Sequence, residues 1–184
     1  MSNIIEALIN IVNNKDYKIE QYTTGSNRAQ NMGEALEQYF LDAFCNSFEV
    51  ENEEERISKH QDVFSFLGSK NKIPDAILNK KEALEIKKST SESSIQLNSS
   101  YPKHTLKAND KRIKSSALTC EDDKWEEKEM LYCFGHIPNG KSHIKSIWFV
   151  YGRVFCDLQE VYEGLINDIK SNLDDDYLGN ELVL

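Results

Sequence analysis

Two carboxylates and an amine occur at a spacing that brings them together if their segments form a hairpin. The first carboxylate lies in Ile73-Pro74-Asp75, and the other groups lie in Glu85-Ile86-Lys87. Hydrolysis of a phosphodiester needs an activated water and positive charge beside the phosphate. Magnesium held by carboxylate oxygens supplies both, and a lysine adds a compact positive charge. The pattern therefore predicts the groups of a magnesium-dependent phosphodiesterase.

The intervening residues have the pattern of a β-hairpin. Pro74–Leu78 is apolar and extended after its proline, Asn79–Lys81 is a polar turn, and Glu82–Lys88 resumes an alternating pattern. A loop of these three residues pairs Leu78 with Glu82. Loop length fixes the register of a hairpin, and a two-residue loop would break this register.

The same register places Asp75 opposite Glu85 on one face of the hairpin. The two-residue period of a strand directs Glu85 and Lys87 to that face and Ile86 to the other. One face can then do chemistry while the other packs in the core. The alternative is a surface hairpin with ordinary charged edges, because a motif this short also occurs by chance.

The net charge of −9 is distributed unevenly along the chain. Residues 80–114 contain nine Lys or Arg and four acids, a local charge of +5, whereas acids are concentrated near residues 49–55, 121–129 and 157–184. The local field decides whether a phosphate backbone is attracted. The basic segment is compatible with DNA binding, and its alternative is a solvated lysine-rich loop.

Length and composition predict a single domain over residues 1–184, with a core of about residues 1–172 and an acidic tail at 173–184. No apolar run approaches the roughly 20 residues of a membrane span, and the N-terminus lacks a signal-peptide pattern. We therefore expect an intracellular, cytoplasmic protein with no membrane partner. The cysteines form no CxxC pair and the histidines show no metal-ligand spacing, which argues against a zinc site or a disulfide framework.

Apolar periodicity predicts helices and strands in mixed order. An amphipathic helix is expected from about Arg28 to Ser47, after a first helix near the N-terminus. Further strands are expected at Val63–Leu67, Met130–Ile137 and Ile144–Tyr151. The fold class that we predict is mixed α/β, with a central mixed β-sheet flanked by helices. The last of these helices follows Asp157 and carries one apolar face (Leu158, Val161, Tyr162, Leu165, Ile166 and Ile169).

Glu37 is a further candidate for the site. It lies at the edge of the apolar stripe of the helix from about Arg28, near the open space left by Gly33. It can therefore look inward toward the hairpin. Its alternative is an exposed carboxylate at the rim of the helix.

The polar loop Leu97–Leu106 follows the predicted catalytic strand. Asn98 suits contacts to base edges, and the hydroxyl and cationic side chains suit contacts to phosphates. The alternative is a surface loop held by local Ser and Asn hydrogen bonds. The DNA-contacting residues that we expect, here and in the motifs that follow, are Arg28, Lys88, Asn98, Ser99, Ser100, Tyr101, Lys103 and His104.

Several motifs in combination resemble one known family. Together they resemble type II restriction endonucleases of the NgoPII group, which belongs to the PD-(D/E)xK nuclease superfamily. The resemblance runs from the N-terminal helix to Trp148-Phe149-Val150-Tyr151-Gly152 and implies a restriction-endonuclease-like core. The other motifs are Asn27-Arg28-Ala29, Gly33-Glu34-Ala35-Leu36-Glu37, Pro74-Asp75, Glu85-Ile86-Lys87-Lys88 and Leu97-Asn98-Ser99-Ser100-Tyr101-Pro102-Lys103.

The resemblance also implies an activity. A homodimer would cut both strands of a short palindrome with Mg²⁺, and a companion DNA methyltransferase would protect the host genome. The group is associated with GGCC. Carried over to this chain, Asp75 and Glu85 would ligate magnesium, the backbone carbonyl of Ile86 would add a ligand, and Lys87 would orient or activate the water. Glu37 matches the helix acid that often completes such sites.

Two other functions stay open at this point. A repair or junction nuclease of the same fold would share the catalytic residues and read DNA shape instead of sequence. A non-catalytic acidic interaction protein, or a truncated DNA-binding relative, would bind its partner without cutting DNA. Asp75 and Glu85 on opposite faces of the sheet would favour the binding protein.

Overall fold

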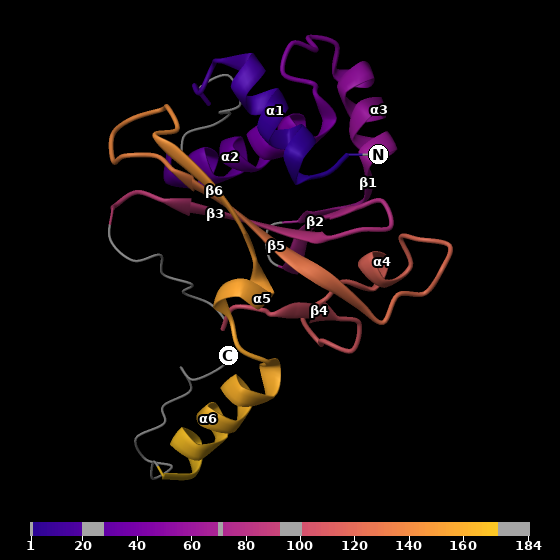
Figure 1. The fold of residues 1–184 in the computed structure, drawn as a ribbon, viewed down its shortest axis with the longest axis vertical. Helices are drawn as coiled ribbons and strands as arrows, with labels where there is room; N and C mark the ends of the chain where they lie inside the picture. Colours follow the sequence, from indigo (N-terminus) through magenta and orange to yellow (C-terminus); the bar gives the residue numbers. More distant parts are fainter. Residues whose placement is uncertain (1, 20–27, 70–71, 93–100, 173–184) are drawn as a thin grey trace.

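The computed structural model describes residues 2–19, 28–69, 72–92 and 101–172, without the side chains of residues 28–31, 69 and 72. Within these ranges the chain forms a sheet with helices on both sides (Figure 1). The helices are α1 (Ile4–Asn14), α2 (Arg28–Cys45), α3 (Glu53–Val63), α4 (Ser115–Leu118), α5 (Gly152–Phe155) and α6 (Gln159–Asn172), and the strands are β1 (Phe64–Ser69), β2 (Lys72–Leu78), β3 (Ala83–Ser89), β4 (Thr105–Lys107), β5 (Glu127–His136) and β6 (Ser146–Tyr151).

The sheet has six strands in the order β1-β2-β3-β5-β4, and β6 pairs with β5 beside β4. Strands β1, β2 and β3 are antiparallel neighbours, β3 and β5 are parallel, and β4 and β6 both run antiparallel to β5. A parallel pair requires a long connection, and β4 and α4 lie within the connection from β3 to β5. This mixed sheet flanked by helices confirms the predicted fold class.

Alternate residues of the strands enter two hydrophobic cores, one on each face of the sheet. The helix-side core packs α1 and α2 against one face and includes Leu36, Phe40 and Leu84. The second core lies on the other face, beneath α4 and α5, and includes Ile77 and Tyr132. A strand residue can therefore be assigned to a face of the sheet by the core that the residues two positions away along the same strand enter.

Helix α3 was not predicted, because its sequence carries more charge than apolar periodicity. Its N-terminus is capped by Asn52, whose side chain accepts a hydrogen bond from the amide of Glu55 at 3.0 Å. Three acids in the first turn interact favourably with the positive end of the helix dipole. The buried Asp42 of α2 binds Arg56 and His60, which ties α3 to α2. The last three acids of the run at 49–55, Glu53, Glu54 and Glu55, therefore form the first turn of α3.

The last predicted helix is present as α6, but it does not flank the sheet as expected. Helix α6 has no buried residue and lies apart from the sheet (Figure 1). It is held through Tyr162, which stacks on Tyr101 with ring centroids 5.2 Å apart, and through Glu163, which accepts from the Tyr101 hydroxyl at 3.1 Å. Three of its apolar side chains are about half exposed, namely Val161 at 51%, Leu165 at 60% and Ile169 at 47%.

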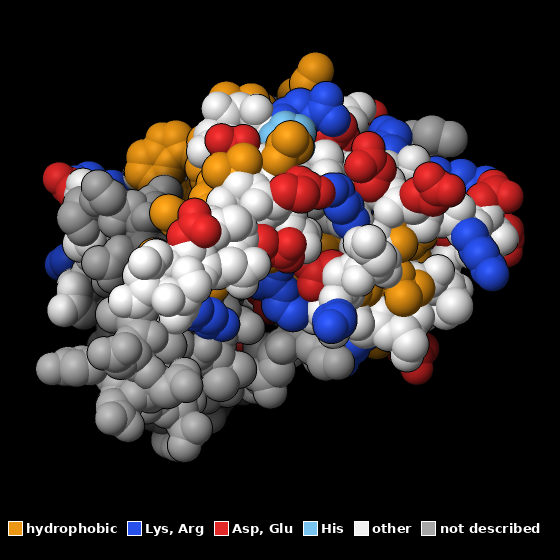
Figure 2. All heavy atoms as spheres, turned by 90° about the horizontal axis from the view of Figure 1, so that it is seen from below, with side chains coloured by type: hydrophobic (Ala, Val, Ile, Leu, Met, Phe, Trp, Pro, Cys, Tyr) orange, Lys and Arg blue, Asp and Glu red, His pale blue; other side chains and the backbone are white. Residues whose placement is uncertain are grey.

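The surface mixes charges of both signs. Seen from below, Lys and Arg side chains lie among Asp and Glu, and hydrophobic side chains gather at the left of the view (Figure 2). Charged groups more than a Debye length apart interact little at physiological salt. The net charge of −9 therefore does not describe the field at any one place. None of the helices in the described ranges combines the length and the apolar character that a membrane span needs.

Candidate active site

The β2–β3 hairpin has the register that the three-residue loop predicts. Ala76 pairs with Leu84 and Ile77 pairs with Ala83. At the turn, the amide of Leu78 donates to the carbonyl of Glu82 at 3.0 Å. Because each step along one strand is matched by one step back along the other, this register sets residue 75 opposite residue 85. The predicted juxtaposition of the two carboxylates is confirmed.

The two strands separate where the carboxylates begin, since the described ladder between β2 and β3 ends at the pair Ala76–Leu84. In the resulting fork the Ile86 amide donates to Oδ2 of Asp75 at 2.6 Å. The Lys87 ammonium binds Oε1 of Glu85 at 2.5 Å. Two carboxylates and an amine therefore meet at one place.

These side chains lie on one face of the sheet. Ile77 and Ala83 enter the second core, so Asp75, Glu85 and Lys87, at two-residue steps from them, point to that face. Ile86 packs on the helix-side core instead. The arrangement that would have favoured a binding protein, with the carboxylates on opposite faces, is not present.

The fork concentrates negative charge in a partly enclosed place. The Glu85 side chain is 9% exposed and the Lys87 side chain is 35% exposed. Burial and the charge of Glu85 raise the pKa of Asp75 to about 8, and the charge of Glu37 acts in the same direction. Burial opposes the charge on Lys87, but Glu85 and Asp75 raise the pKa of its ammonium above the usual value. The single positive charge of Lys87 therefore does not balance the negative charges of both carboxylates when both are ionised. The same carboxylates keep Lys87 protonated.

The residues of the fork fit a hard divalent cation. Oε2 of Glu85 is buried and has no hydrogen-bond partner within the described residues. Carboxylate oxygens are the ligands that Mg²⁺ prefers, and Mg²⁺ usually keeps water and takes substrate phosphate as further ligands. The described ranges contain no group of three or more His, Cys, Asp or Glu side chains that could hold a metal ion. The protein would therefore supply Asp75 and Glu85, with the Ile86 carbonyl available as a further oxygen.

Glu37 lies on α2, close enough for its charge to act on Asp75. It is partly buried, as the inward-facing prediction requires. Whether it touches the metal or the water stays a prediction.

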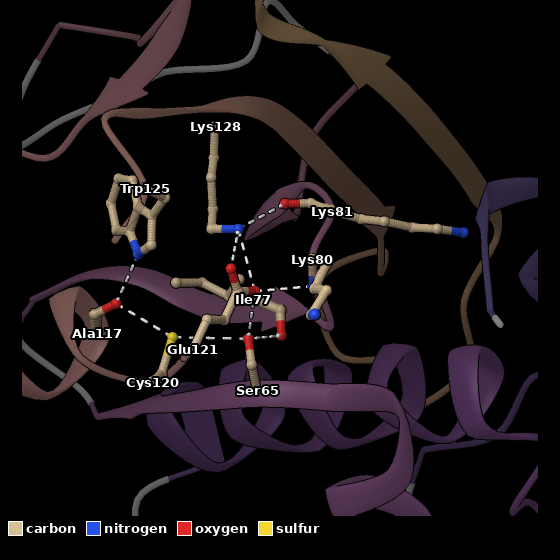
Figure 3. Close-up of polar contacts among 9 residues, drawn as sticks. All are labelled: Ser65, Ile77, Lys80, Lys81, Ala117, Cys120, Glu121, Trp125 and Lys128. Atoms are coloured by element: carbon tan, nitrogen blue, oxygen red, sulfur yellow. Dashed lines mark hydrogen bonds and ion pairs between the residues drawn. The ribbon is translucent and has the colours of Figure 1, made fainter. Parts of the chain in front are cut away.

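The turn of the hairpin is anchored by a buried ion pair that sequence reasoning missed (Figure 3). The Lys128 ammonium lies 2.9 Å from Oε2 of Glu121, and both side chains are less than one tenth exposed. Oε1 of Glu121 accepts from the Lys80 amide at 2.8 Å and from the Ser65 hydroxyl at 3.0 Å. Lys128 also donates to the carbonyl of Lys81 at 3.2 Å. These contacts hold the turn that sets the register of the fork.

The predicted DNA-contacting residues have different surroundings. Asn98, Ser99 and Ser100 lie outside the described residues, as does the side chain of Arg28 at the start of α2. Lys88 is partly buried on β3, and burial lowers the pKa of its ammonium.

The remaining three lie in the segment that precedes β4. Lys103 is 5% exposed and forms an ion pair with Asp110, so its ammonium faces inward. Tyr101 stacks on α6 and carries the Arg112 guanidinium 4.9 Å above its ring. Nδ1 of His104 is buried without a hydrogen-bond partner in the described ranges. Their contact with DNA stays a prediction.

The sequence of the chain is also similar to known proteins. A family model described as NgoPII restriction endonuclease matches residues 2–178 of the chain. The chain belongs to the NgoPII restriction endonuclease family. A member of the family, the type II restriction enzyme NgoPII of Neisseria gonorrhoeae, is 40% identical to it over 173 residues. That match covers 93% of this chain and 60% of the relative, so the chain spans about three fifths of the relative's length. No solved structure gives a significant match.

Membership of the NgoPII family confirms the resemblance that the motifs predicted. The hairpin with Asp75, Glu85 and Lys87 lies within the matched residues, and so do α2 and the β5–β6 pair. The Glu121–Lys128 pair also lies there. Nothing in local spacing identifies that pair, because its importance comes from the distant turn that it binds.

Proposed function

We propose that this member of the NgoPII family is a type II restriction endonuclease that hydrolyses double-stranded DNA with Mg²⁺. The observation that carries the proposal is the meeting of Asp75, Glu85 and Lys87 on one face of the fork. The unpartnered Oε2 of Glu85 and the pKa of Asp75 that burial raises both favour a bound cation. Family membership makes DNA the substrate to test.

In this proposal each residue of the fork has a separate task. Asp75 and Glu85 hold Mg²⁺, with the Ile86 carbonyl as a further ligand. When bound, the ion would withdraw negative charge from the phosphate and lower the pKa of a water. Lys87 holds its proton and orients the attacking water or a phosphate oxygen through its ammonium. The hydrogen bond from Ile86 to Asp75 fixes the direction of that carboxylate.

The finer expectations are part of the same proposal. The target would be the palindrome GGCC, cut by a homodimer in which each protomer cleaves one strand. A companion methyltransferase would protect the cytoplasmic DNA of the prokaryotic host. Arg28, Lys88 and the loop from Asn98 to His104 would contact the DNA. The +5 charge of residues 80–114 supports attraction of a phosphate backbone at this end of the sheet.

The test is digestion of unmethylated phage DNA by the purified protein with Mg²⁺, followed by sequencing of the fragment ends. We expect discrete fragments that share GGCC at the cleavage site, and no fragments in EDTA. DNA methylated at GGCC should resist cleavage. Binding without cleavage would support the truncated binding relative, and cleavage confined to branched DNA would support the repair or junction nuclease. With neither binding nor cleavage, the acidic interaction protein becomes the better account.

A further inference from the structure

From Met130, the fourth residue of β5, through β6 to Cys156 the sequence lacks acidic residues. Residues 130–156 contain three Lys or Arg and two His but no Asp or Glu, in a chain with 31 acids and 22 Lys or Arg overall. Lys141, His143 and Lys145 lie in the connection between the two strands, and all three are exposed. This connection, residues 137–145, is called the basic loop below. A phosphate backbone would meet attraction there without a neighbouring carboxylate from the same stretch.

One acid from another element does reach the basic loop. Glu92 forms an ion pair with Lys145, and the side chains of the two residues are 73% and 56% exposed. An exposed ion pair of this kind contributes between about 0 and 1 kcal/mol. A DNA phosphate can therefore replace Glu92 as the partner of Lys145 at little cost.

Trp148 lies in one row with the catalytic lysine. Phe134 of β5 pairs with Lys87 of β3 on one side and with Trp148 of β6 on the other. Residues that are directly paired across strands point to the same face of a sheet. Phe134 and Val150 both pack in the second core, which lies on the face that carries the carboxylates. Trp148 therefore projects from the catalytic face.

Trp148 differs from its neighbours in exposure. Phe134 is 4% exposed and is covered by Phe155 of α5, with ring centroids 6.4 Å apart, whereas Trp148 is 48% exposed. An indole has a large apolar plane and one N–H donor, and such side chains are used at interfaces with one apolar and one polar side. The next row along the strands is polar, with Ser89, His136 and Ser146.

The separation between Lys87 and Trp148 suits a duplex. Two strand spacings amount to about 10 Å, which is less than the width of about 12 Å of the major groove alone. A duplex with one phosphate beside Lys87 therefore covers Trp148 when it extends from β3 toward β6. The basic loop lies beyond, at the end of the same two strands.

We propose that Trp148 packs its indole against the bound DNA duplex beside the scissile phosphate, while the basic loop holds the neighbouring phosphates. This inference rests on the proposed function, because it names a further part of the same DNA interface. A large aromatic side chain that becomes buried in an interface often contributes strongly to binding, because it removes a large apolar surface from water. Trp148 would hold the duplex in position over the fork.

The chain allows a direct test, because it contains two tryptophans, Trp125 and Trp148. Trp125 donates from its indole to the carbonyl of Ala117 at 3.0 Å, near the opposite end of β5. Trp125→Phe leaves Trp148 as the only reporter, and Trp148→Phe leaves Trp125. Each variant would be titrated with an unmethylated GGCC duplex in EDTA at low salt, while the anisotropy of a label on the DNA measures binding independently.

We expect the emission of Trp148 to change with the same midpoint as the anisotropy, and its quenching by acrylamide to fall. The emission of Trp125 should stay constant. Trp148→Ala should weaken DNA binding by about 5-fold to about 100-fold, whereas Trp148→Phe keeps an aromatic plane and should retain most of the affinity. A thermal melt equal to that of the wild type would show that Trp148→Ala is folded.

Three results would overturn the inference. If the duplex binds while Trp148 emission and the affinity of Trp148→Ala stay unchanged, Trp148 is outside the interface, and the proposed function stands. If Trp148 emission depends on protein concentration without DNA, this face binds a second copy of the chain. If wild-type protein binds no duplex in the anisotropy assay and cuts none with Mg²⁺, the proposed function fails together with the inference.

Discussion

Replacement of Asp75 by Asn should stabilise the metal-free protein while it abolishes cleavage. Asp75 and Glu85 meet at the fork, and burial and the charge of Glu85 raise the pKa of Asp75 to about 8. In the unfolded chain an aspartate has a pKa of about 3.9. The asparagine side chain of the variant keeps an oxygen that can accept from the Ile86 amide, so the local hydrogen bond at 2.6 Å can persist.

The sign follows from proton binding. Between pH of about 4 and about 8 the folded state holds a proton on Asp75 that the unfolded state has released, so stability falls as pH rises. Each pH unit in this window corresponds to about 1.4 kcal/mol. From pH 5 to pH 7 the carboxyl therefore removes about 3 kcal/mol from the free energy of unfolding, which lowers Tm by about 6 to 12 °C for a chain of this size.

The assay is urea unfolding in EDTA at pH 5 and pH 7 for the wild type and for Asp75→Asn. Other titrating groups are common to both proteins, so the difference between their free energies of unfolding isolates residue 75. That difference should grow by about 3 kcal/mol in favour of the variant at pH 7, and Mg²⁺ should reduce it by stabilising only the wild type. Asp123→Asn, at an exposed acid, serves as the control. Equal pH dependence in wild type and Asp75→Asn would refute the reasoning.

Three further outcomes follow from the same contacts. Lys87→Ala should reduce the single-turnover rate constant of cleavage about 100-fold or more, while a binding titration should show little change in duplex affinity. Loss of binding with unchanged single-turnover cleavage would contradict the role of its ammonium. Glu121→Gln leaves its buried lysine partner without a counter-charge and should destabilise the protein by about 3 kcal/mol in urea; an unchanged midpoint would show that the pair does not hold the turn. Gly152→Ala places a Cβ in a clash with the backbone oxygen of Lys103 and should lower Tm, whereas Gly164→Ala meets nothing within 4 Å and should raise it slightly; similar melts for the two would contradict the close approach.

The sequence predicts the fork well because the rules that form it are local. Loop length set the register of β2 and β3, and the strand period placed Glu85 and Lys87 on one face. These rules need no knowledge of the rest of the molecule. The family resemblance depended on the same local motifs.

The parts that sequence reasoning missed depend on distant contacts. The periodicity of α6 identifies an apolar side, but not what covers it, and the helix is instead held by Tyr162 and Glu163. Glu121 and Lys128 look like ordinary surface charges until the turn at Lys80 and Lys81 is placed beside them. Tyr132 pairs with Glu85 and accepts from the Lys103 amide at 2.7 Å, a contact between residues far apart in sequence.

The central claim is that the carboxylates of the fork act with Mg²⁺ to cut DNA. The most direct measurement is the single-turnover rate of cleavage of an unmethylated GGCC duplex by wild type, Glu85→Gln and Glu126→Gln. Glu126 is an exposed acid just before β5 and provides the matched loss of charge. We predict that wild type and Glu126→Gln cut the duplex with Mg²⁺ and that Glu85→Gln does not. Cleavage by Glu85→Gln at the wild-type rate, or cleavage by wild type in EDTA, would contradict this account.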